Sequence, residues 1–167
     1  MKLPDAEDLF QTFAEQLQPM VTSNTALVGI HRGGVWLMER MRSILGDRVS
    51  YGSLDAAFYR DDFSQRGLRQ TSKAAQIPFQ VEDKHIILID DIFYTGRTTR
   101  AAMNELFDYG RPASIALAVL IDRGGRQLPI VPQVSAAQIP LLVHQRFALS
   151  QDTRGRLHLA LEEQVDA

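Results

Sequence analysis

Short apolar runs alternate with amphipathic segments along most of this 167-residue chain. The apolar runs predict buried strands over residues 26–30, 86–89 and 114–121. Apolar residues at helical spacing predict helices over residues 5–18, 35–45 and 102–107. A polar turn that contains glycine follows each of the three strands. Strands that alternate with helices in this way indicate an α/β fold, in which a parallel sheet has helices on both faces.

Three further segments carry weaker patterns. Residues 49–59 contain β-prone side chains and predict another strand, and the polar segment that follows predicts a mobile loop over residues 60–78. The tail segment RLHLALE, at 156–162, alternates apolar and polar residues and predicts an added strand or a small lid. The sequence shows no linker, repeat or low-complexity stretch, so we expect residues 1–167 to form a single domain.

Composition narrows the classes of function. The formal net charge of −2 and the sequence pI near 6.1 give no global positive field for nucleic acid or for a membrane surface. There is no cysteine, which excludes disulfides, thiolate zinc sites and a cysteine nucleophile. The histidines are scattered, so the sequence predicts no metal site made of protein ligands alone. The N-terminus lacks the apolar core of a signal peptide, and we expect a soluble cytoplasmic protein.

The second predicted strand ends in two adjacent carboxylates, Asp90 and Asp91, followed by the turn at 94–98. Burying two unpaired acids is costly, so we expect them to face a ligand where the strand emerges. A glycine turn that leads into a helix exposes backbone N–H groups, which together with the helix dipole favour a phosphate. An alternative is that a threonine here only caps the helix. Carboxylates beside a phosphate suit a ligand that also brings hydroxyls or a divalent cation, and a sugar phosphate does both.

Residues 86–98, IILIDDIFYTGRT, resemble the phosphoribosyl pyrophosphate (PRPP) signature of type I phosphoribosyltransferases. The usual dinucleotide and P-loop glycine patterns are absent from this stretch. Two further strings, GRPA at 110–113 and LAVLIDRG at 117–124, are similar to the PyrR family of bifunctional pyrimidine-operon regulators and uracil phosphoribosyltransferases. The resemblance implies the type I phosphoribosyltransferase-like fold: a central, mainly parallel sheet flanked by helices, with a small hood formed by the terminal segments.

The resemblance implies a role for each polar turn. The carboxylates of Asp90 and Asp91 would hold the ribose hydroxyls. The turn that binds the 5′-phosphate would comprise Ile92, Phe93, Tyr94, Thr95, Gly96, Arg97 and Thr98. The turn that binds the diphosphate would comprise His31, Arg32 and Gly33. Taken alone, the histidine in that turn fits a surface position equally well.

Two further segments complete the implied site. The closing loop would begin with Tyr59, Arg60 and Asp61, and its arginine would reach the diphosphate. The base would lie against Asp122, Arg123 and Gly124. The family commonly has a histidine after that glycine, whereas this chain has Gly125. The residues with implied catalytic roles are Arg32, Arg60, Asp90 and Asp91.

The resemblance implies that uracil and PRPP react to give UMP and diphosphate. It also implies Mg²⁺ bound mainly through PRPP, and a homo-oligomer, either a dimer or a tetramer. Two alternatives stay open: a nucleotide-sensing, RNA-binding regulator of pyrimidine genes, and a type I phosphoribosyltransferase for another base. RNA is the less favoured partner because residues 5–18 carry four acidic residues and no Lys or Arg. The Gly-Lys-Asn that the family has after its LPI string is replaced by Ala136, Ala137 and Gln138.

Overall fold

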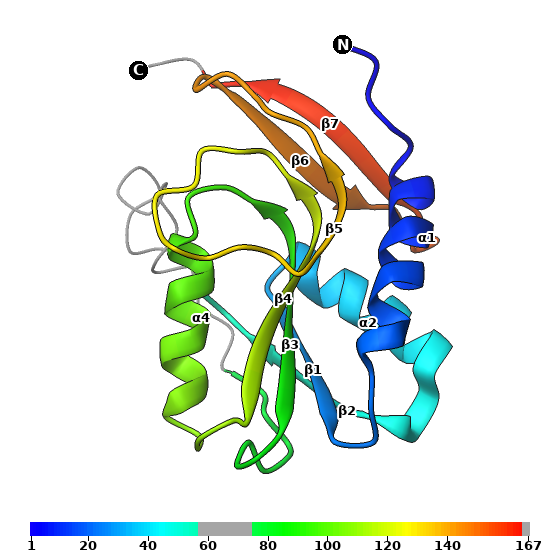
Figure 1. The fold of residues 1–167 in the computed structure, drawn as a ribbon. Coiled ribbons are helices and arrows are strands. Elements are labelled where there is room, and N and C mark those ends of the chain that lie inside the picture. The colour runs from blue at the N-terminus through cyan, green and yellow to red at the C-terminus, as the bar shows by residue number, and fades with distance from the viewer. Residues whose placement is uncertain (57–74, 165–167) are drawn as a thin grey trace.

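The computed structural model describes residues 1–56 and 75–164. Within these residues, five strands form one sheet in the order β2-β1-β3-β4-β5, and all four neighbouring pairs are parallel. The strands are β1 (Thr25–Ile30), β2 (Ser50–Leu54), β3 (His85–Phe93), β4 (Ser114–Asp122) and β5 (Val134–Gln138). Their carboxyl ends therefore meet at one edge of the sheet, which is the upper edge in Figure 1. This arrangement confirms the α/β fold and the parallel sheet predicted from the sequence.

Helices cover both faces of the sheet (Figure 1). Helices α1 (Ala6–Leu17) and α2 (Gly33–Leu45) bury their apolar stripes with one face of the sheet, in a cluster that includes Phe13, Leu37 and Met41. Helix α4 (Arg97–Phe107) packs on the other face through residues such as Leu106. Two short 3₁₀ segments, η1 (Gln18–Met20) and η2 (Gly46–Arg48), follow the first two helices. No helix of the described residues is both long enough and apolar enough to cross a membrane.

The C-terminal strands β6 (Gln145–Gln151) and β7 (Leu157–Glu163) form a separate antiparallel pair. We call this pair the hood, because it lies above the carboxyl edge of the main sheet in Figure 1. Its buried residues Phe147 and Leu157 belong to the same core cluster as α1, so the N-terminal helix and the C-terminal strands pack together. The hood of terminal segments implied by the family resemblance is confirmed.

Several boundaries differ from those predicted. Strand β3 continues through the acid pair to Phe93 because its last residues still pair with β4, so the carboxylates lie in the strand and not beyond it. Strand β2 ends at Leu54, before the end of the predicted strand. The RLHLALE segment is a strand, β7, whose partner β6 the sequence pattern did not predict. Strand β5 was also missed, because VSAAQ is short and weakly apolar.

The predicted mobile loop over 60–78 lies mostly outside the described residues. Its last part is ordered: Gln76 exchanges two backbone hydrogen bonds with Ser53, at 2.8 and 2.9 Å. Ile77 packs against the core cluster beneath α4. The chain therefore returns to the side of β2 before it enters β3. Mobility of the preceding residues stays a prediction.

Glu7 joins three parts of the fold. Its carboxylate accepts a hydrogen bond from Arg40 Nη2 on α2 at 2.6 Å and from the Leu157 backbone N–H on β7 at 2.7 Å. The Arg40 guanidinium also lies over the Phe10 ring, 4.2 Å from its centroid. The hydrogen bond from Arg40 holds the pKa of the Glu7 carboxyl below its ordinary value. One acidic side chain of α1 thus ties the hood to the helical face of the sheet.

We expect Glu7→Gln to lower the free energy of unfolding by about 1–3 kcal/mol, because a charge-assisted hydrogen bond becomes a neutral one. Since folding lowers the Glu7 pKa, its contribution is present above the unfolded pKa and is lost as pH falls through the folded one. The stability difference between the two proteins should therefore shrink below about pH 4. Urea unfolding at several pH values measures it. Glu15→Gln, on the exposed side of the same helix, is the matched control, and an equal loss there would contradict the assignment.

Candidate active site

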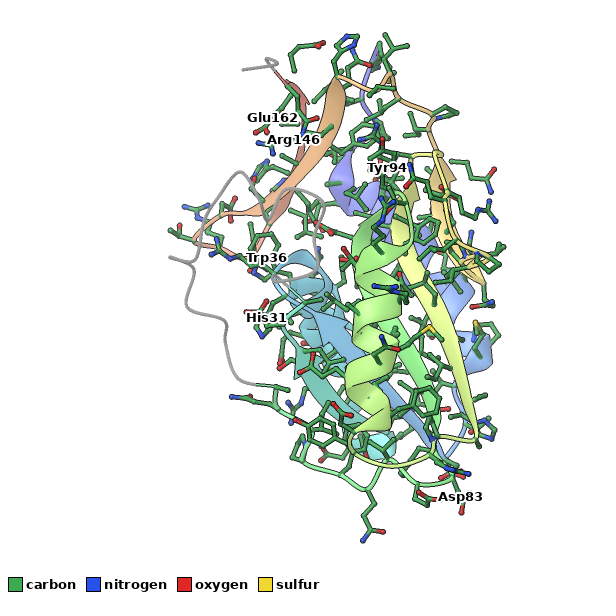
Figure 2. All side chains as sticks on the ribbon, turned by 90° about the vertical axis from the view of Figure 1, so that its left-hand side faces the viewer. His31, Trp36, Asp83, Tyr94, Arg146 and Glu162 are labelled. Carbon is green, nitrogen blue, oxygen red and sulfur yellow. The ribbon has the colours of Figure 1, made fainter. Side chains whose placement is uncertain are left out.

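A pocket of about 340 Å³ opens at the carboxyl edge of the sheet, under the hood. The end of β3 contributes Asp90 and Asp91 with the two residues that follow them, and the turn at 94–96 and the first residues of α4 continue the wall. Arg123, at the end of β4, forms another side. Figure 2 shows Tyr94 above the N-terminal end of α4, with Arg146 and Glu162 on the hood strands nearby. The pocket therefore lies where ligands of parallel α/β sheets bind.

The turn before α4 lines the pocket at the N-terminus of the helix, where backbone N–H groups lack partners within the helix. Gly96 is the N-cap residue, with φ of +97°, a conformation that glycine adopts without the steric cost of a Cβ. The Thr95 hydroxyl accepts a hydrogen bond from the Arg97 N–H at 3.2 Å, and its carbonyl accepts one from Gln127 at 2.9 Å. The capping alternative thus accounts for Thr95, which satisfies the first N–H of α4, but it does not account for Thr98 and Thr99, which line the pocket. The turn has the features of an anion site.

The two carboxylates are held by their own backbone. Asp90 Oδ1 accepts a hydrogen bond from the Asp91 N–H, and Asp91 Oδ1 accepts one from the Ile92 N–H, both at 2.9 Å. Asp90 is buried, with 6% of its surface exposed, whereas Asp91 is half-buried. Both line the pocket and can accept hydrogen bonds from ligand hydroxyls.

Two glycines allow the predicted diphosphate turn to lie close to the acid pair, because neither has a Cβ. A Cβ on Gly33 would lie closer than 3.0 Å to the Asp91 carboxylate, and one on Gly34 would lie closer than 3.0 Å to the Ile89 carbonyl oxygen. The turn is also joined to β2 by the hydrogen bond from the His31 N–H to the Leu54 carbonyl, at 2.8 Å. His31 is half-buried and Arg32 is exposed, and neither lines the pocket itself. The turn therefore lies beside the pocket, next to Asp91.

Of the predicted base turn, Arg123 lines the pocket and Asp122 does not. The carboxylate of Asp122 accepts a hydrogen bond from the Gly124 N–H at 2.9 Å, so it shapes the turn and does not line the pocket. Arg123 lines the pocket, and its guanidinium lies 3.8 Å from the centroid of the Tyr94 ring. Burial lowers the pKa of Arg123 from its ordinary value. The structure thus brings the predicted phosphate and base turns into direct contact.

The hood supplies residues that sequence reasoning missed as ligand contacts. Arg146 and Phe147 from β6, and Gln164 after β7, complete the pocket wall. Arg146 is paired with Glu162 of the neighbouring strand at 2.7 Å. The alternating pattern of the tail predicted an added strand or a small lid. That pattern does not indicate which edge of the sheet such a strand would cover. The predicted Tyr59, Arg60 and Asp61 lie outside the described residues.

The pocket offers few side-chain donors for a metal ion. Among the described residues, no cluster of three or more His, Cys, Asp or Glu side chains could hold a metal ion. Two carboxylates do line the pocket, and carboxylate oxygens are hard ligands of the kind that Mg²⁺ accepts. Mg²⁺ commonly keeps several waters and binds through one or two carboxylates plus substrate phosphates. The residues present fit an ion that arrives with a phosphorylated ligand.

Comparison with known proteins places this geometry in a family. Residues 4–143 match the model of the phosphoribosyl transferase domain. The bifunctional protein PyrR of Pseudomonas entomophila (strain L48) is 44% identical over 98% of this chain and 95% of its own length. That of Pseudomonas fluorescens is 43% identical over 95% of this chain and 97% of its own.

Solved structures agree on the fold. A hypoxanthine phosphoribosyltransferase from Staphylococcus aureus superposes with a TM-score of 0.62, at 21% identity, over 84% of this chain and 77% of its own. A purine phosphoribosyltransferase from Pyrococcus horikoshii Ot3 does so with a TM-score of 0.58, at 25% identity, over 80% of this chain and 81% of its own. The sheet, the pocket at its carboxyl edge and the identity along nearly the whole chain lead to one assignment: this chain belongs to the phosphoribosyltransferase domain family and, within it, to the PyrR proteins.

Proposed function

We propose that this phosphoribosyltransferase transfers the phosphoribosyl group of PRPP to uracil, giving UMP and diphosphate. The observation that carries the proposal is that two adjacent carboxylates and the N-terminal turn of α4 line one pocket. That combination suits a ligand with hydroxyl groups close to a phosphate. Uracil as the acceptor is supported by the 44% identity to bifunctional PyrR proteins. A type I phosphoribosyltransferase for another base is the alternative.

Each part of the pocket has a distinct role in this reaction. Asp90 and Asp91 accept hydrogen bonds from the ribose hydroxyls and fix the sugar in place. The backbone N–H groups and the threonine hydroxyls of the α4 turn bind the 5′-phosphate. Positive charge develops on the ribose ring as diphosphate leaves, so fixed geometry and exclusion of water contribute most of the rate. Arg32 is exposed and precedes Gly33, which lies against Asp91, and its guanidinium would bind the departing diphosphate.

Mg²⁺ would be held by PRPP oxygens, by water and by the carboxylates of Asp90 and Asp91. When bound, it would neutralise charge on the diphosphate. The protein's own contribution is to present acceptors on one side of the pocket and the positive end of a helix dipole on the other. We also expect the protein to act in the cytoplasm, as a dimer or a tetramer.

We expect PRPP with Mg²⁺ to raise the melting temperature of the protein, because a ligand that binds only the folded state stabilises it by mass action. At a ligand concentration about 100 times Kd the gain is about 2.7 kcal/mol. Differential scanning fluorimetry with and without Mg²⁺ measures it. Ribose and inorganic diphosphate, added separately, are the matched ligands. The absence of any shift with millimolar PRPP and Mg²⁺ would remove the site assignment.

RNA sensing is the second candidate, since the related proteins are called bifunctional. Two of the three arginines that could form a basic patch near the pocket already have partners, and the third, Arg126, is exposed. Arg123 is buried under Tyr94, and Arg146 is paired with Glu162. The acidic residues of α1 lie where the family resemblance would have placed basic contacts. Specific RNA capture needs several cations that neutralise phosphates. These observations favour the enzymatic function over regulation.

We therefore expect weak RNA binding without sequence preference. The measurement is a titration of the pyrimidine-operon leader RNA of the source organism at physiological salt, with and without UMP. A scrambled RNA of equal length is the control. Comparable, weak affinities for the two RNAs are expected. Tight binding of the true leader alone, strengthened by UMP, would make regulation the primary function.

A further inference from the structure

Arg123 is a buried cation with unused hydrogen-bonding capacity. Its side chain lies at the pocket wall with 6% of its surface exposed. Nη2 donates a hydrogen bond to the Leu142 carbonyl at 3.2 Å, whereas Nε is buried and has no hydrogen-bond partner among the described residues. A guanidinium carries five N–H donors and no acceptor. Nε is too enclosed for a ligand to reach, but among the described residues Nη1 and the second N–H of Nη2 have no hydrogen-bond partner, so they can donate to a ligand acceptor in the pocket.

The Tyr94 ring holds this guanidinium in place. The ring centroid lies 3.8 Å from Arg123 Cζ, the distance of a stacked cation–π contact. The backbone also holds the two turns together, because the Arg123 N–H donates to the carbonyl of Phe93, the residue before Tyr94, at 3.0 Å. Tyr94 itself lines the pocket. The ring therefore limits the directions in which the Arg123 donors can point.

Gly125 makes room for that ring. A Cβ at this position would lie closer than 3.0 Å to two carbon atoms of the Tyr94 ring, Cδ2 and Cε2. At the neighbouring Gly124, which also has positive φ, a Cβ would meet nothing within 4 Å. Both glycines have a positive φ, but only at Gly125 would a Cβ collide with the Tyr94 ring. In this chain the Tyr94 ring, which comes from the phosphate turn, lies where the side chain of residue 125 would otherwise be.

We propose that Arg123 donates a hydrogen bond to the C4 carbonyl oxygen of the acceptor base, and that Tyr94, accommodated by Gly125, is the positioning residue that aims this donor. The proposal rests on the function proposed above and specifies its acceptor. A group that can only donate selects a base with a carbonyl oxygen at that position and rejects one with an exocyclic amino group there. Uracil and UMP should therefore bind better than cytosine and CMP.

Steady-state kinetics with uracil and PRPP provide the first test. Arg123→Met removes the donors and keeps the length of the side chain, and it should raise KM for uracil by about tenfold or more. Tyr94→Ala should also raise KM for uracil, by a larger factor than it raises KM for PRPP. Tyr94→Phe, which retains the ring, should recover most of that loss. Equal loss in the Ala and Phe variants, or loss confined to PRPP, would overturn the positioning role.

A double-mutant cycle isolates the contact between Gly125 and Tyr94. Gly125→Ala should raise KM for uracil in the wild-type background and should add little once Tyr94→Ala has removed the ring. The melting temperature of Gly124→Ala gives the loss of stability that a non-glycine residue at positive φ causes without a steric clash. Additive effects of the two substitutions on KM would contradict the proposal.

Equilibrium binding of UMP and CMP, followed by thermal shift, separates this inference from the proposed activity. UMP should bind more tightly than CMP, and Arg123→Met should remove the difference. If uracil is converted to UMP but Arg123→Met leaves the preference intact, the inference fails and the enzymatic function stands. If uracil is not converted but the preference depends on Arg123, the inference stands without that function.

Discussion

Replacing Asp90 and Asp91 together by asparagine should lower kcat/KM for PRPP by about 100- to 10,000-fold, because two charge-assisted hydrogen bonds are lost, each of about 1.5–3 kcal/mol. Both carboxylates line the pocket and accept hydrogen bonds from the strand backbone. Asparagine keeps a carbonyl oxygen for those backbone bonds, so the fold should survive. Initial rates at varied PRPP, together with melting temperatures, measure both effects.

Asp108→Asn is the matched control for the charge. This exposed acid ends α4, away from the pocket lining, and its replacement removes one negative charge from the same part of the chain. We expect its kinetics to match the wild type. If the double variant of the acid pair has the kcat/KM of the wild type, the carboxylates only accept hydrogen bonds from the backbone of β3. The sugar-binding assignment would then be wrong.

Gly34→Ala should lower the free energy of unfolding by at least about 3 kcal/mol. The new Cβ would collide with the Ile89 carbonyl oxygen, which belongs to the central strand β3 and cannot move aside. Helix α2 would have to separate from the sheet. Urea unfolding measures the loss. A variant as stable as the wild type would contradict the close packing of α2 on β3.

Gly33→Ala tests the neighbouring contact with a different expected outcome. Its Cβ would meet the Asp91 side chain, which can rotate away, so the loss of stability should be smaller and the loss of activity larger. Gly46→Ala supplies the control for a simple glycine substitution, because a Cβ there meets nothing within 4 Å and only its backbone conformation is strained. That strain should cost about 1–3 kcal/mol of stability, with kcat/KM unchanged.

The centre of the fold could be predicted from the sequence because its signals are local. Strand β3 contains a continuous apolar run that leads directly into the acid pair, and the α4 turn follows the strand along the chain. Neighbouring positions in the sequence are then neighbours in space. The carboxyl ends of parallel strands share one edge, so the turn after β4 could be placed next to the turn after β3 without any structure.

The remaining parts depended on contacts that no local pattern records. Phe147 and Gln164 reach the pocket from the last strands, and their position follows from how the hood packs on α1 through Leu157 and Glu7. Gly125 was seen from the sequence only as a missing side chain. Its steric reason, the Tyr94 ring, comes from a different turn.

Formation of labelled UMP from radiolabelled uracil, PRPP and Mg²⁺ tests the central claim most directly. The assay uses the full chain, with the double asparagine variant of Asp90 and Asp91 as the negative control and with hypoxanthine, guanine and orotate as competing acceptors. The account predicts UMP and an equal amount of diphosphate from the wild type, and almost none from the variant. Folded protein that makes no UMP, or that uses one of the other bases in place of uracil, would contradict it.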